Sequence, residues 1–218
     1  MPENSNKVRI AVNVMRARLT VIGFNIAIVS FQISQLYKMS GGVSVPGVDH
    51  QIHLRATLAL FVALSLSLIS MIAFIMSCAH DEVGVCDHWS FLAGDLLMYL
   101  AVAFTVTGFF SPIQESFNTV GNSLPDQLVH QLKIFQKTLL YFGAFAWFAA
   151  MYVGPIISIL RSPFSRRINR RLGTVYVGIV LALHWVNTQA FMFEIANSAK
   201  KTVVPVHFLM ELVQPLKW

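Results

Sequence analysis

The sequence contains four stretches of about 20 apolar residues that together include one formally charged side chain, Asp95. A helix of about 20 residues covers the roughly 30 Å hydrocarbon core of a bilayer. A fifth stretch is more polar but similar in length. Because backbone in lipid must satisfy its own hydrogen bonds, each stretch is predicted to be a transmembrane helix. The predicted spans are 19–37, 56–78, 89–110, 138–160 and 172–193.

Composition and the short connections between the spans favour one membrane-embedded unit. Hydrophobic residues make up 56% of the chain and charged residues 12%, which leaves too little polar surface for a water-soluble protein of this size. No connection is long enough to hold a separate domain. The predicted fold is therefore an all-α polytopic membrane helical bundle, with residues 1–218 forming a single domain.

Basic residues predict the orientation of the bundle. The connection between the fourth and fifth spans holds five arginines and no acid, and loops rich in Lys and Arg face the cytoplasm. An N-in, C-out topology follows, with Arg16 and Arg18 on the same side. We assign the net charge of +6 to anionic lipid headgroups at the span ends, not to nucleic acid. The loop arginines are Arg161, Arg166, Arg167, Arg170 and Arg171.

Two short helices are predicted at the membrane interface. One begins with Ser123 as its cap and Pro125 in its first turn. Its apolar residues recur every three or four positions as far as Leu139, so it is expected to lead into the fourth span. The other, 206–214, lies between two prolines and is too short to span, so it is expected at the surface.

Asp95 is the sharpest candidate for function, because it lies about two turns into the third predicted span. An ionised carboxylate costs roughly 2.5–3.5 kcal/mol near the bilayer centre. On a functional interpretation it faces the bundle interior, a water-filled path or a subunit contact. On a structural interpretation it is hydrated or paired with a basic side chain.

Other polar side chains in the first and fifth spans recur at helical spacings, so each set shares one face. Together with Asp95 these faces could line a polar seam for an ion, a proton or a small solute. The alternative is ordinary hydrogen bonding between helices. The residues of the seam are Asp95, His184, Asn187, Thr188, Asn25, Gln32 and Gln35.

Two series of small residues at four-residue spacing predict close helix contacts. Pro155, next to the second series, has no N–H and is expected to free the carbonyl one turn earlier and to bend the fourth helix. The series are Ala59, Ala63 and Ser67 in the second span, and Ala146, Ala150 and Gly154 in the fourth.

A set of two cysteines and two histidines near the connection of the second and third spans has the chemistry of a tetrahedral zinc site. Its members are Cys78, His80, Cys86 and His88. Their spacing is not that of a C-x2-C knuckle, so reduced cysteines and solvated histidines remain the alternative. A multi-haem bundle is not expected, since His184 is the one histidine well inside a predicted span.

Three classes of function are compatible with these features. The first is a small ion channel or transporter that forms a homo-oligomer around the polar seam. The second is a non-catalytic integral subunit of a larger membrane complex, respiratory or other, whose aromatic fourth span meets partner subunits. The third is a metal-dependent or redox membrane enzyme. The sequence has no phosphate-binding loop and no H-E-x-x-H, G-x-S-x-G or C-x-x-C motif, so the first class is preferred over an enzyme.

Overall fold

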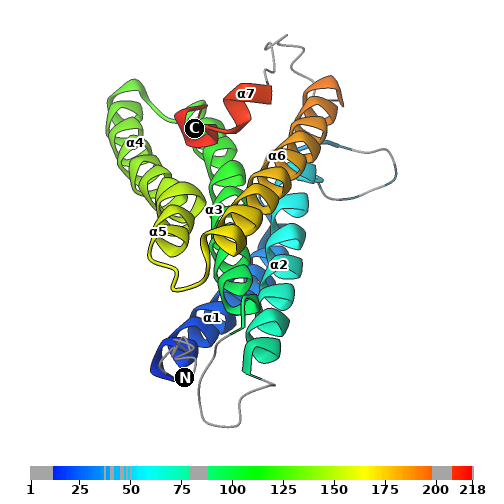
Figure 1. The fold of residues 1–218 in the computed structure, drawn as a ribbon. Helices are drawn as coiled ribbons and strands as arrows, with labels where there is room; N and C mark the ends of the chain where they lie inside the picture. The colour runs from blue at the N-terminus through cyan, green and yellow to red at the C-terminus, as the bar shows by residue number, and fades with distance from the viewer. Residues whose placement is uncertain are drawn as a thin grey trace, which may run out of the picture.

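The computed structural model describes residues 12–36, 38–39, 42–44, 47, 49, 51–78, 88–197 and 208–217. These residues form helices joined by short connections, with an isolated bridge between Val43 and Ile52. Among them, five helices are long and apolar enough to cross a membrane. This confirms the predicted number of spans and indicates a multi-pass membrane protein (Figure 1).

The long helices alternate in direction through the bundle, and two short helical elements follow them. The elements are α1 (Val12–Leu36), α2 (Leu54–Cys78), α3 (Ser90–Gly121), α4 (Asp126–Phe148), the π-helical η1 (Ala149–Val153), α5 (Gly154–Leu160), α6 (Arg166–Asn197), α7 (Phe208–Glu211) and the 3-10 helix η2 (Gln214–Lys217). The helices α4, η1 and α5 follow one another without a break and form one long helical unit.

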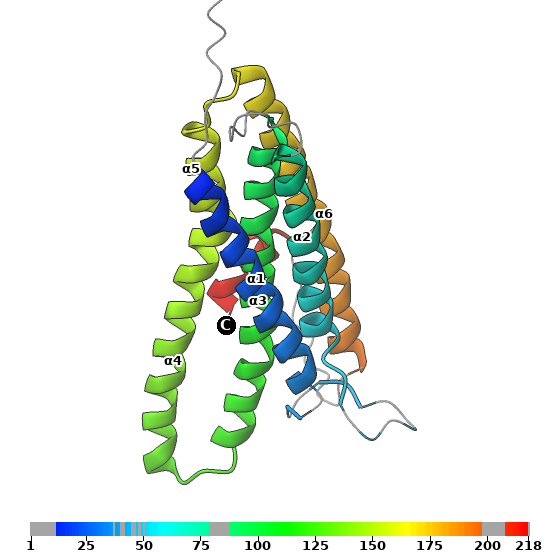
Figure 2. The same ribbon diagram turned by 90° about the horizontal axis from the view of Figure 1, so that it is seen from below.

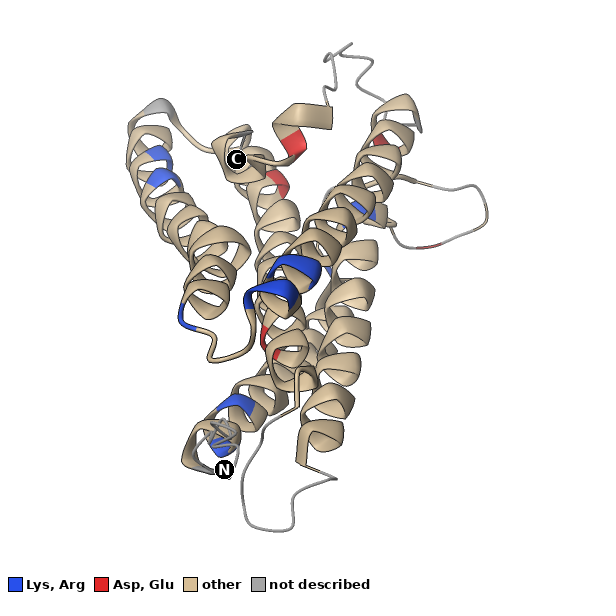
Figure 3. Ribbon diagram, in the orientation of Figure 1, with Lys and Arg blue, Asp and Glu red and all other residues tan. Residues whose placement is uncertain are grey.

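The bundle has two ends, which differ in charge. We call the end with the start of α1 and the connection from α5 to α6 the arginine end, and the opposite end, where α7 lies, the C-terminal end. In the ribbon of Figure 3, Lys and Arg positions gather at the start of α1, the end of α5 and the start of α6. The arginine loop and the start of α1 therefore share one end, as the predicted topology requires. Which side of a membrane that end faces stays a prediction.

Two helices extend well beyond the apolar stretches that predicted them. The 32 residues of α3 correspond to about 48 Å at 1.5 Å per residue, which exceeds the hydrocarbon thickness. The helix predicted to begin at Ser123 is the first part of α4 rather than a separate element, and it begins at Asp126 after Pro125 at the N-cap. The Ser123 hydroxyl does not cap it and instead donates to the Thr119 carbonyl at 3.4 Å.

The core centres on α2 and α3, the most extensively packed pair of helices. Ala59, Ala63 and Ser67 are fully buried on α2, as the small-residue spacing predicts. On α3, a Cβ added to Gly108 would lie 2.6 Å from the Leu60 Cγ. Only a glycine lets the two backbones approach this closely.

In the fourth span, the close approach predicted from small residues is found at one end of the series. A Cβ added to Gly154 would lie 2.5 Å from the Tyr99 ring, and Ala150 is buried, whereas Ala146 is exposed. The predicted close helix contact therefore involves the second half of the small-residue series, where the helix meets α3.

Pro155 is preceded by an irregular turn, the π-helical η1. Proline has no N–H to donate to the carbonyl one turn earlier, which is that of Met151. The Tyr176 hydroxyl of α6 donates to this carbonyl at 2.7 Å. The freed acceptor that the sequence predicts is thus satisfied by a neighbouring helix, and it ties α6 to the fourth span.

Beyond this tie, α4 and α6 diverge toward the C-terminal end, and residues 208–217 lie between them over α3 (Figure 1). Figure 2, in which the view is turned by 90°, also shows this segment close to α3. We call these residues the C-terminal segment. Its position at the membrane interface stays a prediction, but within the protein it packs onto the bundle, where Glu211, Gln214 and Pro215 are buried. The Tyr152 hydroxyl also donates to the Leu212 carbonyl.

Candidate functional site: a buried polar centre around Arg55

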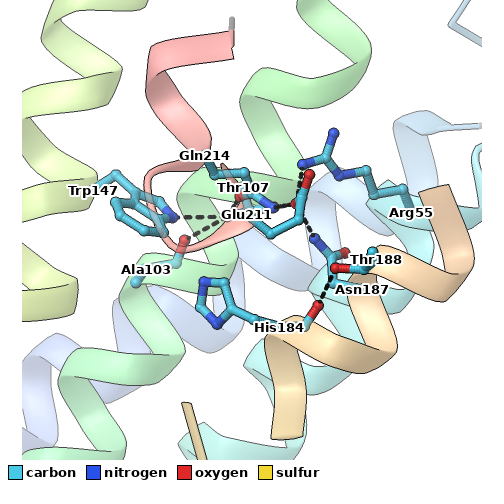
Figure 4. Close-up of polar contacts among 9 residues, drawn as sticks. All are labelled: Arg55, Ala103, Thr107, Trp147, His184, Asn187, Thr188, Glu211 and Gln214. Carbon is cyan, nitrogen blue, oxygen red and sulfur yellow. Dashed lines mark hydrogen bonds and ion pairs between the residues drawn. The ribbon is translucent and has the colours of Figure 1, made fainter. Parts of the chain in front are cut away.

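The C-terminal segment meets the bundle at a cluster of buried polar side chains, shown in Figure 4. We call this cluster the Arg55 centre. Its members come from four long helices and from the C-terminal segment, so residues far apart in the chain converge on it. They are Arg55 of α2, Thr107 of α3, Trp147 of α4, Asn187 of α6, Glu211 of α7 and Gln214 of η2.

The Glu211 carboxylate is the hub of the centre and has no exposed surface. Its Oε2 accepts from Arg55 Nη2 at 2.8 Å, from Gln214 Nε2 at 2.8 Å and from Asn187 Nδ2 at 3.3 Å. The Arg55 guanidinium also lies over the Phe191 ring, 4.7 Å from its centroid. A buried carboxylate is tolerated when a cation and hydrogen-bond donors compensate for lost hydration, and all of these are present.

A directed chain of hydrogen bonds leads from Trp147 to the carboxylate. The indole N–H donates to the Thr107 hydroxyl at 3.0 Å, and this hydroxyl donates to Gln214 Oε1 at 2.8 Å. Indole can only donate, so the Thr107 oxygen is the acceptor of that bond. The one proton of Thr107 has two acceptors within reach, Gln214 Oε1 and, at 3.2 Å, the Ala103 carbonyl of its own helix. The amide of Gln214 then donates to Glu211. The chain orients Gln214 with its carbonyl toward α3 and its NH₂ toward the acid.

A second acid, Glu194 of α6, lies beside the start of α2 and accepts the Arg55 backbone N–H at 2.7 Å. This N–H belongs to the first turn of a helix, where backbone donors have no partner within the helix. The Glu194 carboxylate therefore caps α2 from a neighbouring helix, at the positive end of its dipole.

Next to this cap, His53 faces the Glu115 carboxylate of α3, with 3.6 Å between Nδ1 and Oε2. Its Nε2 lies 3.2 Å from the Met39 carbonyl. Burial opposes protonation of His53, but the hydrogen bonds to Glu115 and Met39 and the charges of Glu115 and Glu194 outweigh it and raise its pKa. This end of the bundle is therefore rich in acidic partners.

His184 and Thr188 of the predicted seam lie beside the Arg55 centre (Figure 4). The His184 ring packs edge-on against Phe104 and Trp147, with centroids 5.9 and 6.1 Å away. Its Nδ1 lies 2.8 Å from the Val180 carbonyl, and the Thr188 hydroxyl donates to the His184 carbonyl at 2.8 Å. Both side chains thus bond to their own helix, while Asn187 reaches the acid.

Two buried atoms of the centre have no hydrogen-bond partner, Arg55 Nε and Asn187 Oδ1. One is a donor on a cation and the other is an acceptor. Among the described residues, Ser77 Oγ at the far end of α2 is the other buried side-chain atom in this state. Buried polar atoms are nearly always satisfied by protein, water or ligand. Water or a polar ligand would satisfy the pair at Arg55.

Asp95 lies at the arginine end, away from the Arg55 centre. It is buried, and the Arg18 guanidinium of α1 binds it in a two-pronged ion pair, with Nη2 2.8 Å from Oδ2 and Nε bonded to Oδ1. The Ser158 hydroxyl of α5 donates to Oδ2 at 3.2 Å, and Arg18 lies 4.8 Å from the Phe91 ring centroid. This geometry matches the structural interpretation of Asp95, pairing with a basic side chain.

The remaining members of the predicted seam lie on α1. Asn25 is buried and donates to the Ser67 hydroxyl of α2 at 3.0 Å, which is the hydrogen bonding between helices that the alternative interpretation expects. Gln32 and Gln35 are half-buried, and Gln35 donates to Ser34 at 3.4 Å. The structure thus brings His184, Asn187 and Thr188 together and places Asp95 and the α1 residues in separate groups.

The predicted zinc set is only partly described, because His80 and Cys86 lie outside the described residues. Cys78 ends α2, and His88 Nδ1 lies 2.8 Å from the Ser90 hydroxyl. No group of three or more potential metal ligands occurs within the part of the chain that the structure describes. The five arginines predicted to meet lipid headgroups are all exposed at the arginine end.

The sequence patterns do not identify Arg55, Glu211, Gln214, Thr107 and Trp147 as members of one site. Arg55 lies one residue before the second predicted span, and Glu211 lies in a segment too short to span the membrane, so neither is an intramembrane charge by sequence. The one available signal was that 206–214 combines apolar residues with an acid next to predicted spans.

A comparison with protein-family models found no match, and comparisons with curated proteins and with solved structures found no significant match.

Proposed function

We propose that this chain is a small membrane transport protein, a channel or carrier, with the Arg55 centre as its recognition site for a polar solute or ion. The observation that carries the proposal is a buried guanidinium and carboxylate between the long helices, next to an unpaired donor and acceptor. Ionisable groups inside a membrane bundle are costly, and they commonly mark substrate and ion paths.

The location of the centre also supports this proposal. It lies where α4 and α6 diverge (Figure 1), so a solute could reach it from the C-terminal end if the C-terminal segment moved. Apolar packing alone would be enough to hold this segment on the bundle, so stability by itself does not require the buried ion pair. Replacing a buried ion pair with apolar side chains is often neutral or stabilising.

We further propose that the arginine end faces the cytoplasm and that its exposed arginines bind anionic headgroups. The chain is expected to assemble with copies of itself. Mass measurement in mild detergent tests that assembly directly.

Flux across proteoliposome membranes tests the transport function. Vesicles containing the purified protein would be assayed for K⁺, Cl⁻, proton and glutarate movement. We expect one of these fluxes to exceed that of empty vesicles and to fall at least tenfold in Arg55→Gln. The matched control Arg161→Gln, an exposed arginine, should retain it. Absence of every flux from the correctly folded protein, or equal flux in Arg55→Gln, would overturn the proposal.

A second candidate, an accessory subunit of a membrane complex, is favoured by one surface. Tyr141, Phe142 and Phe145 of α4 are between 72% and 77% exposed, whereas Trp147 of the same helix is buried in the core. Such an aromatic face suits a protein partner as well as lipid. Other membrane proteins that co-purify at fixed stoichiometry, and are lost from Phe142→Ala/Phe145→Ala, would favour this candidate.

A further inference from the structure

We infer that the Arg55 centre recognises a small carboxylate and that the C-terminal segment fills the site as an internal ligand. The inference rests on the proposed function in taking this centre as the solute site. It adds the chemical class of the solute and the element that blocks its access.

The division of donors and acceptors supports this inference. In the contacts described above, the long helices act as donors toward the C-terminal segment, through the Arg55 guanidinium, the Asn187 amide and the Thr107 hydroxyl. The segment supplies the acceptors, namely the Glu211 carboxylate and the Gln214 carbonyl. The bundle thus presents a cation and neutral donors to an occupant that carries a carboxylate and a second acceptor.

Departure of the segment would remove the carboxylate that pairs with the Arg55 guanidinium, and it would leave the Thr107 hydroxyl with the Ala103 carbonyl of its own helix as its acceptor. Another anion in place of Glu211 would restore the ion pair. A free carboxylate lacks the backbone tether of Glu211 and could engage the unpaired Arg55 Nε together with Nη2, in the two-pronged geometry that carboxylates prefer with arginine. A second carbonyl or carboxyl group on the solute would replace Gln214 at Thr107.

Chemical rescue by acetate tests the inference in the full-length chain. Glu211→Ala removes an acetate-sized group, so we expect a lower unfolding temperature that sodium acetate restores in a saturable manner. Sodium chloride at equal ionic strength should not restore it. The double variant Arg55→Gln/Glu211→Ala should show no acetate response. Glu115→Ala, which removes a half-exposed carboxylate at the same end, is the matched control and should also show none.

A second measurement decides the matter if Glu211→Ala does not fold. A spin label on Leu209→Cys, an exposed position of α7, reports release of the segment in a background with both cysteines replaced by serine. Glutarate should raise the mobile fraction of the spin label. In Glu211→Gln the same rise should require about tenfold less glutarate, and in Arg55→Gln glutarate should have no effect.

The inference would be overturned if acetate raised the unfolding temperature of Glu211→Ala no more than chloride does. It would also be overturned if acetate raised the unfolding temperature of the double variant as much as that of Glu211→Ala. A label whose mobility ignores glutarate in every variant would overturn it too. Carboxylate binding without any flux would instead support the inference and contradict the transport proposal, so the two fail separately.

Discussion

Arg55 binds two acids through two different groups: its backbone N–H donates to Glu194 at 2.7 Å and its guanidinium to Glu211 at 2.8 Å. One residue at the start of α2 thereby joins α6 to the C-terminal segment. The charges of Glu194 and Glu115 both act on His53, and the Glu115 carboxylate lies 3.6 Å from its Nδ1. The acids of this end of the bundle are therefore coupled to a titratable histidine.

The raised pKa of His53 predicts how stability changes with pH. A group whose pKa is higher in the folded state contributes stability that is fully present below its unfolded pKa, about 6.5 for histidine. That contribution is lost as pH rises through the folded value. The difference in unfolding free energy between the unmodified protein and His53→Gln should therefore shrink as the pH rises above about 6.5. In Glu115→Gln this pH dependence should weaken, and a difference that grows with pH would contradict the assignment.

The Arg18–Asp95 ion pair predicts strong coupling between two residues 77 positions apart. Asp95→Asn and Arg18→Gln should each lower stability by about 1–3 kcal/mol, since each leaves a partly or fully buried group without its charged partner. The double variant should lose less than the sum, with a coupling energy of about 0.5–3 kcal/mol in a double-mutant cycle. Additive losses would show that the pair does not hold α1 to α3.

The same Asp95→Asn variant separates a structural acid from a transport acid. If Asp95 serves mainly to bind Arg18, flux per folded protein should be unchanged once stability is restored by lower temperature. Altered ion selectivity or pH dependence of flux at that temperature would return Asp95 to the conducting path.

The bond from Tyr176 to the Met151 carbonyl predicts a specific cost at the π-helical turn. Tyr176→Phe leaves a buried carbonyl unsatisfied, so unfolding free energy should fall by about 1–3 kcal/mol. Tyr141→Phe is the matched control, because Tyr141 is exposed on α4 and the same atom is removed. Thermal unfolding in detergent micelles measures both, and equal effects would contradict the role given to Tyr176.

Orientation can be measured by labelling single cysteines placed at the two ends of the bundle. Asn122 and Ser165 are both exposed, in the α3–α4 turn and the α5–α6 connection. In a background without native cysteines, an impermeant thiol reagent added to intact cells should modify Asn122→Cys and not Ser165→Cys. The reverse pattern would overturn the N-in, C-out prediction and place Cys78 and Cys86 in an oxidising compartment.

Local patterns in the sequence predicted the long helices better than their ends. The apolar part of the third span stops near residue 110, but α3 continues to Gly121 because polar residues sustain a helix outside hydrocarbon as well. The turn at Pro155 was also predictable, since proline removes a specific donor. Each of these features depends on residues within a few turns of one another.

The Arg55 centre was not predictable in this way. Arg55 and Glu211 are 156 positions apart, and no helical period relates residues across such a distance. Asn187 was identified because it is polar inside an apolar span, whereas its partner acid lies in a segment that is too short to span the membrane. Length and hydropathy report which segments can cross a membrane, and they do not report which short segment folds back onto the bundle.

The position of Glu211 after all five long helices has a consequence for biosynthesis. Chains fold broadly in the order of their synthesis, so the long helices can enter the membrane while the acid that neutralises Arg55 has yet to be translated. A chain that ends before Glu211 would hold every long helix but would lack the carboxylate that binds the Arg55 guanidinium. The Arg55–Glu211 ion pair can therefore form only after every long helix has been synthesised.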